Sequence, residues 1–295
     1  MNSTFATYHP IINFGFFCGV IGIGIFLMHP VFMAVGMVAS LIYALMLGGK
    51  ETFKFLLCFI VPVSVLIIVL NPLFNSRGST ILFNIGENSI TLEAAVYGMC
   101  MAFMLASVMM WFSCYNRIMT GDKFVYLFGR IMPAISLIIS MVMRFVPNYK
   151  TQAKRISDAQ KCIGRDVTNG TFRQKARHGV KIVSVMFSWA LENAIDTSDS
   201  MRSRGYGLKN RTTFSIYRFD RRDATAGTVL FVAMGVVIIG ALMGKCSIEF
   251  YPNIIMTETN AFGIAVYAAY FVLCFLPIAI EVKEVLAWRL MQSKI

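Results

Sequence analysis

Residues 11–48 read IINFGFFCGVIGIGIFLM, then HP, then VFMAVGMVASLIYALMLG, and this stretch decides the fold class. It holds two apolar runs, Ile11–Met28 and Val31–Gly48, and neither run contains a charged residue. A helix of about 20 predominantly apolar residues spans a bilayer. Pro30 favours a tight turn between the two runs. The stretch therefore predicts two membrane-spanning helices joined by a short turn.

Four further apolar segments have the length of a membrane span. They are Phe55–Phe74, Leu92–Cys114, Ala226–Met243 and Phe262–Ile280. The composition agrees, because 57% of the 295 residues are hydrophobic and only 14% are charged, against about 25% charged in soluble chains. The expected fold is an all-α, polytopic membrane protein with about six transmembrane helices. Disorder is excluded, because the chain has too much apolar surface to stay solvated. A soluble nucleic-acid-binding protein is disfavoured, because no aromatic-basic module or zinc-ligand spacing accompanies the positive charge.

The distribution of Lys and Arg predicts the orientation of the spans. The formal net charge is +12. Basic residues such as Lys50 and Arg117 follow the even-numbered spans, whereas the connections 75–91 and 244–261 hold one basic residue each. Cytoplasmic loops of membrane proteins carry the excess of Lys and Arg. We therefore expect both termini and residues 144–223 to be cytoplasmic, in a multi-pass protein of the cell membrane.

The segment 144–223 carries most of the charge and separates spans four and five. It holds 17 of the 27 Lys and Arg and 7 of the 15 Asp and Glu, a net +10. A connection of this length is expected to carry function. The pattern predicts helices over Asn148–Lys161, Phe172–Val185 and Ala190–Met201, with Pro147 before the first of them.

The expected domain organisation follows from these segments. Residues 1–143 form the first part of a transmembrane bundle, 144–223 form a cytoplasmic helical domain, and 224–295 form the last two spans. The apolar stretch 124–143 is expected to be a membrane-associated helix near the cytoplasmic face. A seventh crossing there is disfavoured, because it would place the most basic part of the chain outside.

The run Ser203-Arg204-Gly205 ends the last predicted cytoplasmic helix. A guanidinium beside a helix-ending glycine can make a forked contact with a partner's carboxylate or carbonyl groups, and glycine lets a second backbone approach closely. The ordinary alternative is a capping glycine beside a solvated arginine. The spacing leaves both interpretations open.

Motifs for catalysis, metal binding and nucleotide binding are missing from the sequence. It contains no phosphate-binding loop and no His-Glu-x-x-His pattern, and its three His and seven Cys are scattered singly. Ionisable residues are nearly absent from the predicted spans, which disfavours an ion-coupled carrier and an intramembrane enzyme. We expect a non-enzymatic protein without cofactor or metal. A cleavable signal peptide is not expected, since residues 1–9 lack a basic region.

The chain resembles the transmembrane (T) component of energy-coupling factor (ECF) transporters, the cobalt transport protein Q-type family. The resemblance rests on the His9-Pro10 pair, the helix-turn element Arg144-Phe145-Val146-Pro147, the run AKRISDAQ at 153–160 and the run SMRSRGY at 200–206. Members of the family carry two Ala-Arg-Gly-like motifs, each at the end of a coupling helix that contacts an ATPase. Ser203-Arg204-Gly205 looks like the second motif.

The first motif is degenerate in this chain. The expected Ala-Arg-Gly is replaced by Cys162-Ile163-Gly164, and Arg165 follows the glycine. The first ATPase contact is then made by the displaced Arg165, or it is apolar and made through Ile163.

The resemblance implies a scaffold that transmits motion. Its expected partners are two ATP-binding cassette ATPase subunits, a small integral-membrane substrate-binding S component and membrane lipid, in a bacterial or archaeal cell membrane. The S component selects the substrate, which would be a vitamin or a transition-metal ion. The alternative function is a self-sufficient channel or carrier whose basic cytoplasmic segment binds anionic lipid.

Overall fold

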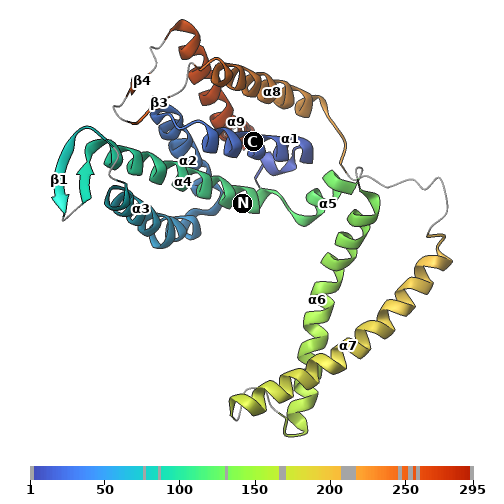
Figure 1. Ribbon diagram of the computed structural model, residues 1–295. Coiled ribbons are helices and arrows are strands. Elements are labelled where there is room, and N and C mark those ends of the chain that lie inside the picture. Colours follow the sequence, from blue (N-terminus) through green and yellow to red (C-terminus); the bar gives the residue numbers. More distant parts are fainter. Residues whose placement is uncertain are drawn as a thin grey trace. The chain divides into compact units, whose positions relative to one another are not determined.

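Helices form nearly all of the computed structural model, which describes residues 3–75, 78–85, 88–129, 132–165, 171–206, 217–244, 248–251, 255–256 and 260–292 (Figure 1). The chain divides into two units. The bundle unit comprises residues 1–123 and 217–295, and the two-helix unit comprises residues 124–216.

The bundle unit is built from six long helices and a few short elements. The helices are α1 (Pro10–Phe26), α2 (Pro30–Phe55), α3 (Val61–Phe74), α4 (Leu92–Ile118), α8 (Arg221–Leu242) and α9 (Ala261–Gln292). The short elements are the 3-10 turn η1 (Phe5–Thr7), the π-helical turn η2 (Leu56–Ile60) and two antiparallel hairpins, β1 (Ile81–Ile85) with β2 (Asn88–Thr91) and β3 (Ile248–Glu249) with β4 (Ile255–Met256).

Each of the six predicted apolar segments is a helix, which confirms an all-α, multi-pass membrane protein. In the described part of the chain, four helical segments are long and apolar enough to cross a membrane, and α1 is a shorter apolar helix. One of the four, Pro30–Phe74, has 45 residues. A helix of that length would measure about 68 Å, roughly twice the hydrocarbon thickness of a bilayer.

The segment Pro30–Phe74 contains two passes because it reverses direction. Gly49 has φ 49° and ψ −123°, a conformation that ends the helical path of α2 and that suits glycine. The Leu47 carbonyl accepts a hydrogen bond from Arg117 at the end of α4, whereas Asn71 of α3 packs against Gly98 near the start of α4. Helix α3 therefore runs opposite to α4. Helices α2 and α3 form a second helical hairpin, after the one that the sequence predicted for α1 and α2.

Aromatic side chains fill the core of the bundle unit. Trp111 of α4, Phe16 of α1 and Tyr43 of α2 are at most 1% exposed. The Phe16 ring meets the Trp111 ring edge to face, with 5.5 Å between the centroids, and the Phe5 ring meets Phe16 at 5.4 Å. Buried aromatic pairs of this geometry add stability beyond the apolar area they bury. The core therefore joins three of the spans to the chain before α1.

Residues 3–9, the N-terminal turn, are held by charged groups from distant parts of the chain. The Glu281 carboxylate of α9 accepts hydrogen bonds from the Ser3 hydroxyl and from the amides of Thr4 and Phe5, the amides at 3.2 and 3.4 Å. Glu281 therefore satisfies amides at the start of η1 that a 3-10 turn leaves without an internal partner.

Two further contacts fix the other side of the N-terminal turn. Lys123, at the start of α5, is 5% exposed. Its Nζ donates to the carbonyl oxygens of Ala6 at 2.6 Å and Ile118 at 3.0 Å. Burial lowers the pKa of Lys123 to about 8. The His9 amide donates to Asp223 of α8 at 3.3 Å, so residues beside both chain connections to the two-helix unit contact this turn.

The two-helix unit consists mainly of α6 (Pro133–Cys162) and α7 (Phe172–Ser203), preceded by α5 (Gly121–Gly129), which begins in the bundle unit. The predicted break at Pro147 is wrong, because α6 continues through this residue. Proline removes one backbone hydrogen bond but does not always end a helix. The predicted separation of Phe172–Val185 from Ala190–Met201 is also wrong, since α7 is one helix.

Helices α6 and α7 contact each other through aromatic rings. The Tyr149 ring lies 5.4 Å from the Trp189 ring, edge to face, and Phe145 stacks on Tyr149 at 5.9 Å. No residue of α7 is buried. The pair is thus held by a small contact and lacks a core of its own.

Candidate functional site

The second predicted motif forms the C-terminal cap of α7. Arg204 has φ −84° and ψ 10°, and Gly205 has φ 79°. The Gly205 amide donates to the Arg202 carbonyl at 3.0 Å, and the Tyr206 amide donates to the Met201 carbonyl at 3.0 Å. This pair of bonds is a Schellman motif, in which the left-handed position favours glycine. Gly205 therefore ends α7 as predicted.

The first predicted motif forms the same cap at the end of α6. Ile163 has φ −94° and ψ 10°, and Gly164 has φ 77°. The Gly164 amide donates to the Lys161 carbonyl at 2.9 Å, and the Arg165 amide donates to the Gln160 carbonyl at 3.0 Å. Both long helices therefore end in a Schellman motif with glycine at the left-handed position.

The shared cap shows which residues of the two motifs correspond. Ile163 occupies the position of Arg204, directly before the glycine. Arg165 occupies the position of Tyr206, directly after the glycine, and its own amide closes the cap. The sequence aligned Ile163 with the missing arginine but left open whether Ile163 or the displaced Arg165 makes the contact, and the cap geometry now sets Ile163 at the position of Arg204. The Ile163 side chain is 66% exposed and available to an apolar partner.

The cap residues are accessible. Ser203 and Arg204 are exposed, and Gly205 is partly exposed. Among the described residues, Arg204 makes no ion pair or hydrogen bond through its side chain. The Ser203 hydroxyl turns inward to the Ser200 carbonyl at 2.9 Å. The five N–H donors of the Arg204 guanidinium are therefore open to a partner.

The two motifs lie at opposite ends of the two-helix unit. Figure 1 shows α7 beginning beside the end of α6 and running away from it. Helix α7 has 32 residues, which corresponds to about 48 Å. The structure therefore does not bring Cys162-Ile163-Gly164-Arg165 together with Ser203-Arg204-Gly205. Cys162 is an exposed free cysteine, and the described residues contain no cluster that could hold a metal ion.

The Arg144–Pro147 element lies in the middle of α6. The Arg144 guanidinium is 5.2 Å from the centroid of the Phe145 ring, a cation–π geometry. The Thr151 hydroxyl donates to the Pro147 carbonyl at 3.1 Å. Since Phe145 stacks on Tyr149, the element supports the side of α6 that contacts α7.

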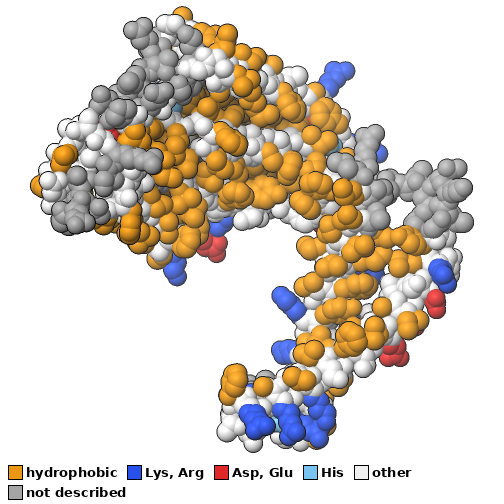
Figure 2. All heavy atoms as spheres, viewed as in Figure 1, with side chains coloured by type: hydrophobic (Ala, Val, Ile, Leu, Met, Phe, Trp, Pro, Cys, Tyr) orange, Lys and Arg blue, Asp and Glu red, His pale blue; other side chains and the backbone are white. Residues whose placement is uncertain are grey.

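An apolar stripe runs along α7 and remains uncovered. Figure 2 shows hydrophobic side chains gathered along both helices of the two-helix unit. On α7 the stripe consists of Val180, Val183, Phe187, Leu191 and Ile195, each between 52% and 70% exposed. Steps of three and four residues place these side chains on one face of the helix. Exposed apolar patches of this kind mark interaction surfaces, and the sequence predicted the face only for Ala190–Met201.

Basic side chains gather at the end of the two-helix unit where α7 begins, as Figure 2 shows. Arg173, Arg177 and Lys181 are exposed on the first turns of α7, and Lys161 is exposed at the end of α6. Such a cluster attracts acidic surfaces or anionic headgroups. The geometry as a whole defines a multi-pass membrane protein with an appended helical pair whose ends and apolar stripe are open to partners.

Comparison with known proteins places this architecture in a family. Residues 14–214 match the family described as cobalt transport protein, CbiQ. The chain belongs to this family, and the resemblance to the T component of ECF transporters is confirmed.

Several relatives carry the name energy-coupling factor transporter transmembrane protein EcfT. The one from Listeria innocua is 26% identical over 68% of this chain and 79% of its own, and the one from Thermosediminibacter oceani is 28% identical over 63% and 72%. The one from Lactobacillus helveticus is 32% identical over 36% of this chain and 38% of its own. An uncharacterised protein of Mycoplasma pneumoniae is 36% identical, but the chain spans only 24% of its length. The chain thus spans well under half of these last two relatives.

Proposed function

We propose that this protein is the coupling and scaffold subunit of an ATP-driven ECF importer, and that it has no catalytic activity itself. The observation that carries the proposal is the pair of Schellman caps at the far ends of α6 and α7. Two equivalent, separated and exposed helix ends suit two copies of a similar partner. Family membership supports ATP-binding cassette ATPases as that partner.

The two contacts are expected to differ in chemistry. At the end of α7, Arg204 would form a forked, charge-assisted contact with a carboxylate or carbonyl of one ATPase. At the end of α6, the exposed Ile163 would enter an apolar part of the other ATPase, because it stands where Arg204 stands. Arg165, two residues after Ile163, is half-buried. It would contribute mainly through its backbone amide, which closes the cap of α6.

The apolar stripe of α7 would bind the S component. Its five side chains offer an apolar surface along four turns of helix, and a small integral-membrane protein offers a matching one. Closure of the ATPases upon ATP binding would move both helix ends. Since α6 and α7 are long and continuous, the motion would reach the stripe and tilt the S component, which would release a vitamin or a transition-metal ion inside.

The bundle unit would anchor this lever in the membrane. Both termini and residues 144–223 would be cytoplasmic, as the distribution of Lys and Arg indicates. The membrane would be the cell membrane of a bacterium or archaeon, in keeping with the source organisms of the relatives.

Co-purification tests the assembly. The full chain, tagged and expressed with candidate ATPases and an S component, is purified in mild detergent, and the subunits in the complex are weighed by native mass spectrometry. We expect two ATPase subunits and one S component for each chain. Recovery of the chain alone at every salt concentration would contradict the proposal and would favour a self-sufficient channel or carrier.

A further inference from the structure

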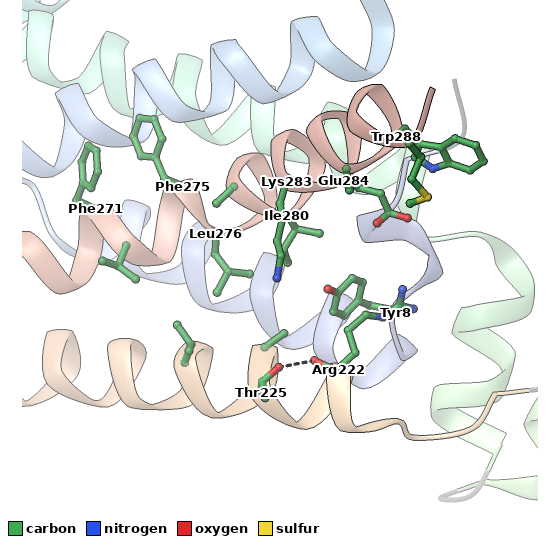
Figure 3. A pocket seen from close by; sticks show the side chains of 16 residues that line it. Tyr8, Arg222, Thr225, Phe271, Phe275, Leu276, Ile280, Lys283, Glu284 and Trp288 are labelled. Atoms are coloured by element: carbon green, nitrogen blue, oxygen red, sulfur yellow. Dashed lines mark hydrogen bonds between the residues drawn. The ribbon is translucent and has the colours of Figure 1, made fainter. Parts of the chain in front are cut away.

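A groove of about 660 Å³ lies between α8 and α9 in the bundle unit. Both helices are among the segments long and apolar enough to cross a membrane. The volume is in the range of sites that bind small molecules, about 300–1,000 Å³. Figure 3 shows that the groove differs along its length, with charged side chains at one end and Phe271 and Phe275 toward the other.

The charged end carries two cations from opposite walls. Arg222 belongs to the first turn of α8, and Lys283 belongs to α9. The Arg222 guanidinium lies 4.6 Å from the centroid of the Tyr8 ring and donates to the Thr7 hydroxyl at 3.3 Å. These contacts hold Arg222 at the groove while leaving most of its donors unused.

Lys283 makes no ion pair within the described part of the chain, and Figure 3 shows its side chain directed into the groove. Glu284 lines the same end, so the charged end has two positive groups and one negative group. Its net charge favours an anion. The carboxylate of Glu284 in addition offers an acceptor to a hydroxyl group of that anion.

The apolar part of the groove extends to the depth of lipid tails. From Lys283 to Phe271 is 12 residues along α9, or about 18 Å, and the hydrocarbon of one leaflet is about 15 Å thick. Leu276, Ala279 and Val229 line this part. Past the charged residues the groove continues to Trp288, which is exposed on α9, and exposed tryptophans are typical of the level of the headgroups.

We propose that the α8–α9 groove is a binding site for one anionic phospholipid, with the phosphodiester between Arg222 and Lys283 and an acyl chain along the apolar wall. A phospholipid matches both parts of the groove at once. An apolar helix of a partner protein would fill the wall but would leave one of the two positive charges unbalanced, since Glu284 supplies a single negative charge. The proposal requires only that α8 and α9 lie in a membrane, and it does not depend on the proposed ECF function.

Native mass spectrometry of the full chain in detergent tests the site. Delipidated protein is titrated with phosphatidylglycerol and, separately, with phosphatidylcholine of the same chain length. We expect one phosphatidylglycerol to bind each chain more tightly than phosphatidylcholine. Lys283→Gln should weaken phosphatidylglycerol binding about fivefold, and Arg222→Gln with Lys283→Gln about thirtyfold. Ala279→Trp should weaken binding of both lipids, because it fills the apolar wall.

Matched controls separate the groove from general membrane attraction. Arg221→Gln with Arg289→Gln removes the same charge from exposed residues that do not line the groove. Ala265→Trp adds the same bulk to an exposed position of α9 outside it. Both controls should bind phosphatidylglycerol as the unmodified chain does. Lys283→Gln removes no ion pair and no side-chain hydrogen bond among the described residues, and glutamine keeps most of the side chain, so the variant should fold as the unmodified chain does.

Four results would overturn the proposal. They are equal binding of the two lipids, equal losses in the controls, unchanged binding by Ala279→Trp, and complete competition by inorganic phosphate, which would indicate a simple anion site. A cysteine at position 279 that cross-links in native membranes to another polypeptide and excludes lipid would identify a protein partner instead. None of these results bears on whether the chain assembles with ATPases.

Discussion

The bundle unit and the two-helix unit use the same kinds of side chain in opposite ways. The bundle unit buries Trp111 and Phe16 in an aromatic core and gives the buried ammonium of Lys123 two carbonyl partners. The two-helix unit leaves the apolar stripe of α7 uncovered, and Arg204 has no ion pair within the described residues. The bundle unit therefore has a buried core of its own, whereas the two-helix unit leaves uncovered the surfaces that the proposed partners would occupy.

This comparison predicts that substitutions at the ends of the two-helix unit act on assembly and not on stability. The largest effect should come from Arg204→Glu. The substitution reverses the charge at the proposed ATPase contact, and removing one partner of such a contact costs about 2–5 kcal/mol. Uptake of the transported substrate should fall by about 30-fold or more. Uptake is measured with labelled substrate in cells that also express the ATPases and the S component.

The control for Arg204→Glu is Arg202→Glu. Arg202 is exposed on the last turn of α7 and lies two residues before the cap arginine. It should retain most of the uptake, and both variants should insert in the membrane at the normal level, measured by fractionation. Normal uptake by Arg204→Glu would show that Arg204 does not couple the chain to an ATPase.

One tryptophan in each unit tests whether the bundle unit has a stabilising core that the two-helix unit lacks. Trp111→Ala should lower the free energy of unfolding by about 3–5 kcal/mol, because it leaves a cavity in the bundle core. Trp189→Ala should have a much smaller effect on the unfolding temperature, since Trp189 is partly exposed and contacts Tyr149 alone among the aromatic rings described. Thermal unfolding in detergent measures both. Equal losses of stability would show that the two-helix unit has a core after all.

The buried Lys123 predicts a pH dependence of the bundle unit. Its pKa is lowered to about 8 from an ordinary value of 10.5. Between these two values the unfolded chain keeps the proton that the folded chain has lost, so stability rises with pH in this window. Thermal unfolding of the unmodified chain, compared with Lys123→Met from pH 7.5 to 10, should show a relative gain toward high pH. A constant difference between the two would contradict a lowered pKa.

The smallest effect is expected from Arg165→Ala. The structure places Arg165 after the capping glycine, where its amide, which alanine retains, closes the cap. Uptake should therefore stay within about twofold, a change below 0.5 kcal/mol. Ile163→Glu, which places a charge at the position corresponding to Arg204, should reduce uptake more strongly. The reverse order would show that the displaced arginine, and not Ile163, makes the first ATPase contact.

The sequence predicted the spans and the glycine at the end of α7 because these depend on local patterns: apolar length, and a glycine after an amphipathic helix. It failed at Pro147, since whether a proline ends a helix depends on the packing around it. It aligned the two motifs by their glycines but could not choose between Ile163 and Arg165 as the contact residue. The positive φ of Gly164 and of Gly205 shows that both glycines take the same left-handed cap position, which no local sequence pattern establishes.

Contacts between residues far apart in the chain could not be predicted from the sequence, for a different reason. Lys123 at the start of α5 donates to the carbonyl of Ala6, 117 residues away in the sequence, so its burial could not be inferred from neighbouring residues. The groove between α8 and α9 likewise depends on how two separate spans pack. Arg222 and Lys283 are 61 residues apart in the sequence, and no local pattern connects them.

The contact between the N-terminal turn and Glu281 has a consequence for biosynthesis. Ser3 and Glu281 are 278 residues apart. At a synthesis rate of about 5–20 residues per second, Glu281 is added roughly 15–55 s after the N-terminal turn has been synthesised. During that time the first spans are already in the membrane while the amides of Thr4 and Phe5 lack this partner. Chains that stop before α9 never acquire it, so the docked turn distinguishes completed copies from truncated ones that quality-control proteases should remove.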